Sequence, residues 1–296
     1  MSQYQVAKLI LNVESDACGA FKRMKDYMLT QKYDAGLNFS FETKDIIDIP
    51  KGKIISDEEI NIKWVKKDPN QDGYYLYTRN HGSVGDIIAL MDVSADWRSA
   101  AITWSNISDH DPREQSYNQS QRWLATHILM GIVFRYYLLH YQGLVSHASA
   151  LKWQGKCLLF SASSGTGKST HVKLWQEYIN DVTVLNDDTP AVRIFNNKPY
   201  VFGTPWSGTA FINSNDSAPL AAIILLEQSK ENVIRKLSVP EAILSFMPRV
   251  FLPYFDESFM KQAMSIFEKI VVSVPVYLLK CRPDKEAVEL VYQCMK

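Results

Sequence analysis

Apolar and polar residues are distributed in two different ways along this chain, and the change lies near residue 110. Before it, short β-branched and aromatic runs are separated by turn-forming residues, which is typical of strands. The clearest runs are Tyr4–Val13, Phe39–Glu42, Ile60–Val65, Tyr74–Thr78, Ile87–Val93 and Ala100–Trp104. From Gln119 to Tyr141 apolar residues instead recur every three or four positions, which predicts an amphipathic helix. We therefore expect a strand-rich domain over residues 1–112 and a second domain over 113–296 that includes this linking helix.

The second domain alternates strand-like and helix-like segments. A strand is predicted at Leu144–Trp153, followed by a hairpin turn and a strand at Lys156–Phe160. A helix is predicted over residues 169–179 and a strand at Val182–Leu185. Further strands are predicted at Ala191–Phe195, Tyr200–Phe202, Ala222–Leu226 and Val276–Leu279, and further helices at Pro240–Phe246, Asp256–Ile270 and from Asp284 onward. We expect an α/β (α+β) domain with a mixed sheet.

One stretch of this domain has the composition of a phosphate-binding loop. Ser161–Thr170 reads SASSGTGKST and lies between an apolar strand and a helix. Gly165 and Gly167 allow a tight turn whose N–H groups converge where the positive end of the helix favours an anion. The pattern G-x-x-x-x-G-K-[ST] is met except at its first position, which is Ala162. A Ser/Gly-rich turn without a ligand is the alternative interpretation.

If the stretch binds a nucleotide, each residue type has a role. The Lys168 ammonium group would meet the outer phosphates of ATP, and the Ser169 hydroxyl would lie where a bridging Mg²⁺ is held. The predicted nucleotide-binding residues are Ser164, Gly165, Thr166, Gly167, Lys168, Ser169 and Thr170.

Two carboxylates follow the next predicted strand. Asp187 and Asp188 stand directly after an apolar run and Asn186, nineteen residues beyond Lys168. In phosphate-loop proteins a carboxylate at the end of a neighbouring strand holds Mg²⁺, and a second one could face the group being phosphorylated. A solvated turn is the alternative, because Asp and Asn favour turns. His147 lies in the strand before the loop, where a lone histidine is more often a core residue than a catalytic one.

The order of these features resembles the kinase domain of HPr kinase/phosphorylase, whose nucleotide core is similar to that of ATP-dependent phosphoenolpyruvate carboxykinase. The resemblance covers roughly Gly143–Lys296, and the segment VPVYLLKCRPDKEAVELV is also similar to the end of bacterial HPr-kinase-related proteins. It implies that Asp187 is the acid/base carboxylate, with His147 as its electrostatic partner. It further implies Asp188 and Ser169 as Mg²⁺ ligands, and a homo-oligomer.

Candidate substrate or phosphate contacts come from two further segments. Residues 203–209 carry two glycines, a proline and three hydroxyl groups, so Trp206, Ser207 and Gly208 could cover the phosphates or the acceptor. The segment could equally be an ordinary turn. Arg249 is the first arginine to consider for neutralising charge on the transferred group, with Arg193 and Arg235 as alternatives.

Composition limits the partners. Thirty-two basic residues balance thirty-two acidic ones, so no overall field draws the chain to nucleic acid or to an anionic membrane. The four cysteines, Cys18, Cys157, Cys281 and Cys294, are far apart and form no C-x-x-C pair. We see no signal peptide and no segment that would span a bilayer, and we expect a cytoplasmic protein.

Together these observations predict an ATP- and Mg²⁺-dependent phosphotransferase acting on a hydroxyl group. The acceptor would be a serine of a protein or peptide, or a free metabolite, selected by the strand-rich domain. The alternatives are a nucleotide-gated binding protein without transfer activity, an enzyme like phosphoenolpyruvate carboxykinase, and a phosphorylase working in the reverse direction.

Overall fold

The chain has a mixed α+β fold with two mixed β-sheets. The computed structural model describes residues 1–14, 22–56, 62–79, 86–106, 112–163 and 165–296, and these ranges contain five α-helices. Cys18 and Ser164 lie outside the described residues. The expected mixture of helices with a mixed sheet is thus confirmed. The chain divides into two compact units, Met1–Tyr137 and Leu138–Lys296.

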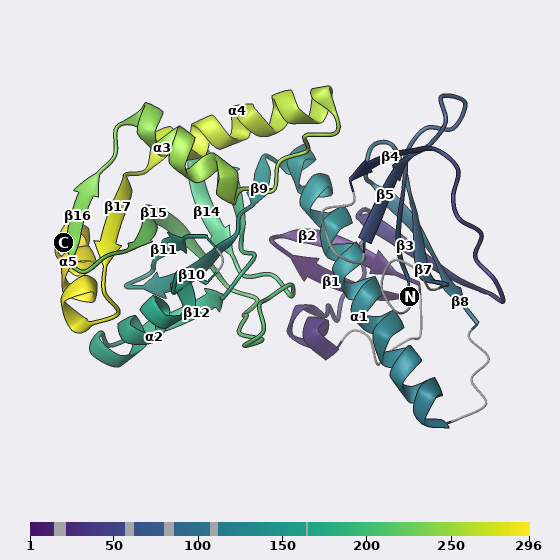
Figure 1. Ribbon diagram of the computed structural model, residues 1–296, viewed down its shortest axis with the longest axis horizontal. Helices are drawn as coiled ribbons and strands as arrows, with labels where there is room; N and C mark the ends of the chain where they lie inside the picture. The colour runs from purple at the N-terminus through teal and green to yellow at the C-terminus, as the bar shows by residue number, and fades with distance from the viewer. Residues whose placement is uncertain (15–21, 57–61, 80–85, 107–111, 164) are drawn as a thin grey trace. The chain divides into compact units, whose positions relative to one another are not determined.

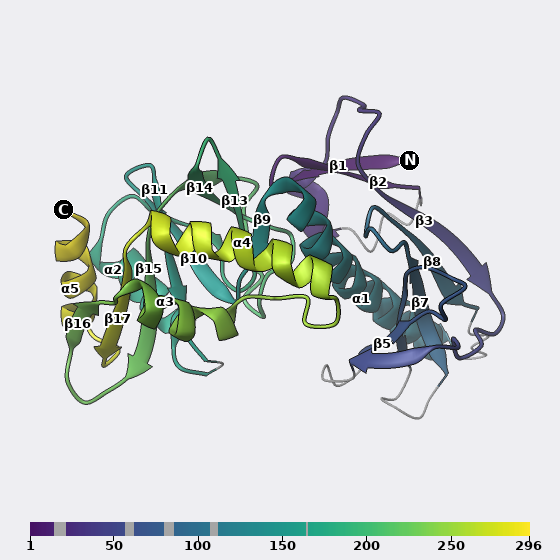
Figure 2. The same ribbon diagram turned by 90° about the horizontal axis from the view of Figure 1, so that it is seen from above.

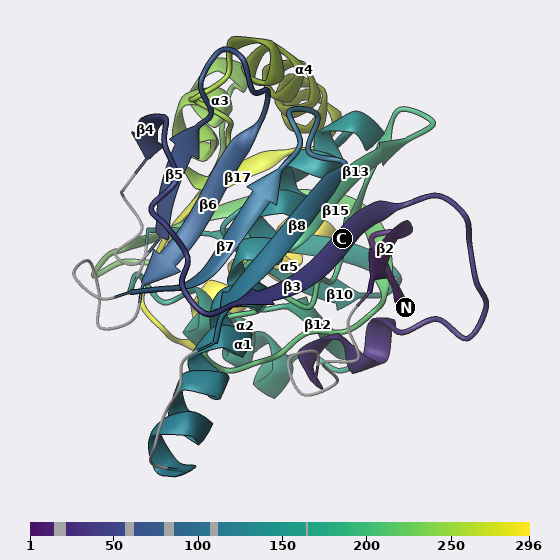
Figure 3. The same cartoon turned by 90° about the vertical axis from the view of Figure 1, so that its right-hand side faces the viewer.

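The first unit is built on an eight-stranded sheet with the order β1-β2-β3-β8-β7-β6-β5-β4, whose central strands lie side by side in Figure 3. β3 pairs parallel with β2 and with β8, and the other neighbours are antiparallel. The bounds are β1 (Ser2–Val6), β2 (Leu9–Val13), β3 (Leu37–Lys44), β4 (Lys53–Ser56), β5 (Ile62–Lys66), β6 (Tyr74–Arg79), β7 (Ile87–Val93) and β8 (Ser99–Ser105), with the 3₁₀ helix η1 (Lys22–Tyr27).

Helix α1 (Pro112–Tyr137) packs against β6, β7 and β8 of this sheet. Its Tyr136 ring contacts the fully buried ring of Trp97 at a centroid distance of 4.7 Å. Trp64 and Tyr74 stack around the same indole, so the aromatic strand residues form a core. The structure groups α1 with the strand-rich unit, whereas the sequence-based division placed this helix in the second domain.

The second unit has a nine-stranded mixed sheet. Seven strands follow the order β12-β10-β11-β15-β14-β13-β9, and β17 pairs with β15 and with β16. The bounds are β9 (Gly143–Val145), β10 (Ala148–Trp153), β11 (Lys156–Ser161), β12 (Val182–Asn186), β13 (Ala191–Phe195), β14 (Lys198–Phe202), β15 (Ser217–Gln228), β16 (Val233–Lys236) and β17 (Val276–Cys281). The helices are η2 (Leu138–Tyr141), α2 (Lys168–Tyr178), α3 (Val239–Phe246), η3 (Met247–Arg249), α4 (Glu257–Ser273) and α5 (Lys285–Met295).

Helices cover both faces of this second sheet. α2 and α5 lie on one side, and α3 and α4 lie on the other (Figures 1 and 2). Under α2 and α5, Phe160 of β11 and Trp175 of α2 are fully buried in a cluster that continues to Val288 and Val291 of α5. Burying each such aromatic side chain stabilises the fold by roughly 1.5–3 kcal/mol. Within the described ranges, no helix has both the length and the apolar character needed to cross a membrane.

The strand directions bring three segments to one edge of the second sheet. β10 runs antiparallel to both β11 and β12, so β11 and β12 point the same way and end at the same edge. β15 runs parallel to β11 and ends there too. The stretch predicted as one strand over Leu144–Trp153 is two strands, because β9 pairs with β13 while β10 pairs with β11 and β12. The break between them places His147 at this same edge.

Candidate functional site

The loop after β11 contains two glycines in the left-handed region of backbone conformation. Gly165 and Gly167 adopt positive φ values of +76° and +112°, and a Cβ at either position would meet nothing within 4 Å. Glycine is therefore required at these positions by conformation and not by space. Gly167 is the N-cap residue of α2, so the loop leads directly into the positive end of this helix. Ala162, at the position of the missing first glycine, is buried at the end of β11.

Lys168 is the first residue of α2, and its ammonium group is held from two sides. Nζ donates to the Ala162 carbonyl at 3.3 Å and lies 2.8 Å from His147 Nε2. Burial lowers the pKa of this ammonium group, the Asp188 carboxylate opposes that shift, and Arg249 adds to it. Ser169 is exposed at the next position, so its hydroxyl is open to a ligand.

His147 joins the lysine to a carboxylate. Its Nδ1 lies 3.1 Å from Asp188 Oδ1, while Nε2 faces Lys168. An ammonium group can only donate, so Nε2 accepts from Lys168, and the ring proton lies on Nδ1 toward Asp188. The resemblance implied a pairing of His147 with Asp187, but in the structure the ring contacts Asp188 instead. The backbone around His147 is fixed as well, because its carbonyl accepts a hydrogen bond from Ser161 Oγ at 2.8 Å.

Asp187 is the buried member of the carboxylate pair. Oδ1 accepts from the N–H of Gly208 at 2.7 Å, and its own N–H donates to the Ile212 carbonyl at 3.1 Å. Burial raises the pKa of the Asp187 carboxyl, the nearby Asp188 charge raises it further, and the Gly208 hydrogen bond partly opposes both. A buried carboxylate with a raised pKa is a stronger proton acceptor than an exposed one.

The segment 203–209 packs directly against this pair. A Cβ at Gly208 would lie 3.3 Å from Asp187 Oδ2 and 3.3 Å from Asp188 Cβ. The Ser207 hydroxyl accepts from Asn213 Nδ2 at 3.0 Å, and the Trp206 carbonyl accepts from Asn186 Nδ2 at 3.1 Å. Of the three predicted contact residues here, Gly208 reaches Asp187, whereas Trp206 and Ser207 bond within the loop and its support.

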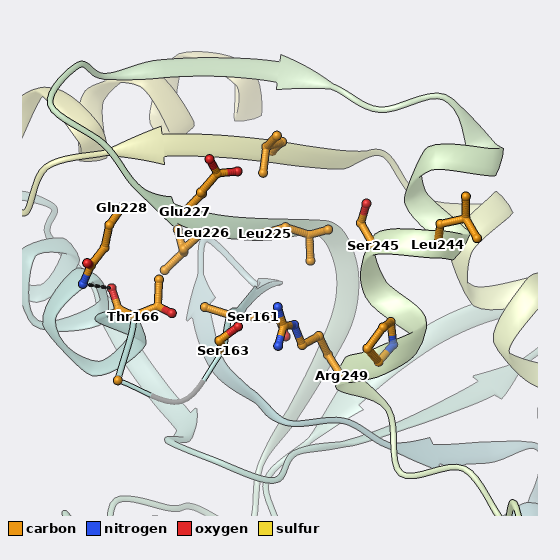
Figure 4. Close-up of a pocket in the computed structure, with 14 residues that line it drawn as sticks. Ser161, Ser163, Thr166, Leu225, Leu226, Glu227, Gln228, Leu244, Ser245 and Arg249 are labelled. Atoms are coloured by element: carbon orange, nitrogen blue, oxygen red, sulfur yellow. Dashed lines mark hydrogen bonds between the residues drawn. The ribbon is translucent and has the colours of Figure 1, made fainter.

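Arg249 faces the loop across a cleft of about 750 Å³. Figure 4 shows its guanidinium group extending toward Ser161 and Ser163. The carbonyl of Arg249 accepts from the His147 N–H at 2.7 Å, which fixes this arginine relative to the histidine. Apolar residues of β15, α3 and β17 also line the cleft: Leu225, Leu226, Leu244 and Leu278.

The two other arginines considered from the sequence have structural contacts. Arg193 is buried and donates from Nε to the Tyr141 carbonyl at 3.1 Å. Arg235 pairs with Glu241 at 2.9 Å near the start of α3. Arg249 is thus the arginine of the three that lines the cleft.

The donors at this edge fit a nucleotide with its Mg²⁺. The positive-φ glycines and Lys168 suit phosphate groups, while Ser169 and the one-third exposed Asp188 carboxylate supply oxygen ligands. In the part of the chain that the structure describes, no group of three or more His, Cys, Asp or Glu side chains could hold a metal ion.

Sequence reasoning missed several residues that support the site. Asn186, Thr189 and Thr204 connect the Asp187–Asp188 turn to the segment 203–209, and Gln228 Nε2 donates to the Thr166 carbonyl at 3.3 Å. Of these residues, Asn186 could have been found from the sequence Asn-Asp-Asp-Thr. An asparagine directly before a turn favours hydrogen bonds from its side chain to the backbone that follows.

Comparison with known proteins gives weak structural similarity and no match at the level of sequence. No protein-family model matches the chain. No curated protein matches its sequence. Among solved structures, the HPr(Ser) kinase/phosphatase from Coxiella burnetii aligns with 51% of this chain and 94% of its own length, at a TM-score of 0.31 and 13% sequence identity. Membership of the HPr-kinase-related family stays a prediction.

Proposed function

We propose that this chain is an ATP- and Mg²⁺-dependent phosphotransferase that moves the γ-phosphate of ATP to a hydroxyl group. The observation that most supports this proposal is that three features lie at one edge of the second sheet. They are the glycine-containing loop 161–170 with Lys168, the His147–Asp188 pair and the buried carboxylate of Asp187. Each alone has a structural interpretation, but the first suits phosphates and the last suits a base.

In the proposed reaction the loop 161–170 holds the phosphates of ATP, and Lys168 with Arg249 offsets their negative charge. Mg²⁺, held by Ser169 and Asp188, would supply further positive charge at the transferred group. The acceptor oxygen bonds to the γ-phosphorus as the bond from that phosphorus to the leaving ADP oxygen breaks. The acceptor proton passes to Asp187, whose burial raises its proton affinity.

The test is transfer of labelled phosphate. The purified protein would be incubated with Mg²⁺, γ-¹⁸O-labelled ATP, a serine-containing peptide pool and a bacterial lysate, and labelled species identified by mass spectrometry. We expect labelled phosphate on a hydroxyl-bearing acceptor. A parallel incubation with oxaloacetate tests the carboxykinase alternative. Its readout is the consumption of nucleotide.

Two variants make the result specific. Asp187→Asn should abolish transfer and leave ATP affinity, measured by calorimetry, nearly unchanged. Asp181→Asn is the matched control, because Asp181 is exposed at a left-handed turn position that asparagine tolerates, and it should transfer at the normal rate. Normal turnover in Asp187→Asn would contradict the assignment of the base. ATP binding without transfer to any acceptor would favour a nucleotide-gated binding protein.

A further inference from the structure

Asn186 lies at the junction of the two segments that form the acceptor side of the site. It is the last residue of β12, directly before Asp187, and its side chain is fully buried. Its Oδ1 accepts from the N–H groups of Asp188 at 2.8 Å and Thr189 at 2.6 Å. One oxygen therefore fixes the turn that carries both carboxylates.

The other end of the same amide holds the facing loop. Nδ2 donates to the carbonyls of Thr204 at 2.9 Å and Trp206 at 3.1 Å. Two hydroxyl groups complete the connection: Thr204 Oγ1 donates to the Thr189 carbonyl at 2.9 Å, and Thr189 Oγ1 donates to the Trp206 carbonyl. The carboxylate turn and the loop are thus bonded as one partly buried unit.

This unit ends at the proposed base. Gly208, two residues beyond Trp206, gives its N–H to Asp187 Oδ1. We propose that Asn186 is a positioning residue for phosphoryl transfer: it holds the loop 203–208 so that the Gly208 N–H orients the Asp187 carboxylate. This inference rests on the proposed function of the site.

The position is selective for asparagine on chemical grounds. The site needs two acceptor contacts on one side and two donor contacts on the other, and a side-chain amide supplies both. Aspartate has nearly the same shape but no donor, so one carboxylate oxygen would face the carbonyls of Thr204 and Trp206. Alanine would remove all four hydrogen bonds that the Asn186 amide makes to backbone groups of the turn and the loop.

The experiment compares Asn186→Asp with a matched variant, Asn232→Asp. Asn232 also donates to two acceptors, Asp284 at 2.9 Å and Glu286 at 2.6 Å, and accepts from the Arg282 N–H at 2.8 Å. Its contacts join β16, β17 and α5 and do not touch the segment 203–208. Both variants replace an amide that donates two hydrogen bonds with a carboxylate, so an effect of that replacement alone would appear in both.

The first readout is amide hydrogen exchange of the nucleotide-free protein over residues 203–212. We expect Asn186→Asp to accelerate exchange there at least tenfold, and Asn232→Asp to leave this segment unchanged. The second readout is kinetic and uses the acceptor that the labelling experiment identifies. For Asn186→Asp, kcat should fall about a hundredfold, the scale for a small misplacement of a catalytic group. The Kd for ATP·Mg²⁺ should change less than threefold. Asn232→Asp should keep its kcat.

If Asn186→Asp does not fold, Thr204→Val tests the same connection, because it removes one hydroxyl and keeps the backbone carbonyl. Accelerated exchange over 203–212 with a lowered kcat and an intact Kd supports the proposal. Unchanged exchange, or an equal rise of exchange throughout the second unit, overturns it. Hydrogen exchange requires no substrate, so it decides by itself whether Asn186 holds the loop. A wild-type protein that transfers no phosphate would separately refute the proposed kinase activity.

Discussion

Lys168 and Asp187 are buried charged groups whose pKa values shift in opposite directions for one shared reason. Burial disfavours the charged form of each, so it lowers the pKa of the ammonium group and raises that of the carboxyl. Each group also has a hydrogen-bond partner, His147 for the lysine and the Gly208 N–H for the aspartate. Perturbed pKa values cluster at functional sites, and structural ion-pair networks produce them as well.

His171 is a buried group at the residue scale that the proposed chemistry does not use. It lies on the first turn of α2 with a side chain 3% exposed and its ring centroid 4.9 Å from that of Phe160. Among the described residues, neither of its ring nitrogens has a hydrogen-bond partner. Burial lowers the pKa of His171 to about 4 from 6.5. The folded protein therefore keeps this ring neutral over a pH range in which the unfolded chain protonates it.

A pH-dependent loss of stability follows from that difference. As pH falls from 6.5 to 4, the unfolded chain gains a proton at His171 that the folded chain does not, which costs about 3 kcal/mol of folding stability by pH 4. Urea unfolding at pH 7 and at pH 4.5 should show a smaller decrease for His171→Leu than for the wild type. His140→Leu is a control for histidine removal in the same unit. Equal acid sensitivity in His171→Leu and wild type would contradict this account.

At the scale of elements, local signals predicted β11, the glycine loop and α2. Their apolar run, glycine spacing and helix start are encoded in consecutive residues. The break at His147 was not predicted, because the sequence around it reads as a continuous strand. The break is decided by pairing partners distant in sequence, β13 for β9 and β12 for β10. The role of the segment 203–209 also depends on a distant partner, the turn after β12.

Gly203 shows how tightly that segment lies on β12. A Cβ at this position would lie 1.9 Å from the Ser214 carbonyl oxygen and 2.5 Å from that of Leu185. Ser214 in turn donates its N–H to the Leu185 carbonyl at 2.9 Å, so these two backbone segments are held together. Glycine is needed here because there is no space for a side chain.

We therefore expect Gly203→Ala to destabilise the protein by about 3 kcal/mol or more, at the upper end of overpacking costs. Gly155→Ala is the matched control: it has a positive φ of +72° in the β10–β11 turn but open space around it, so strain alone should cost about 1 kcal/mol. Denaturant unfolding of both variants measures the difference. A cost for Gly203→Ala no greater than for Gly155→Ala would show that the loop can leave β12 without penalty.

For the whole molecule, every residue assigned to the candidate site belongs to the second unit, as does the core under α2 and α5. The sequence could not divide the chain this way, because helical periodicity does not reveal which sheet a helix covers; α1 packs on strands of the first sheet. Selection of the acceptor by residues 1–112 stays a prediction. Because the second unit contains both the candidate site and a core of its own, nucleotide binding can be tested apart from the acceptor.

A fragment spanning Leu138–Lys296 should fold and bind ATP·Mg²⁺, because it retains its own core and all the proposed nucleotide contacts. Calorimetry should give a Kd within about tenfold of that of the full chain, equivalent to 1.4 kcal/mol or less. Lys168→Ala in the same fragment should weaken binding, whereas Lys173→Ala, on an exposed position of α2, should not. A folded fragment, confirmed by circular dichroism, that lost ATP binding would mean that the first unit contributes to the nucleotide site. Full transfer activity by the fragment would contradict the acceptor-selecting role of residues 1–112.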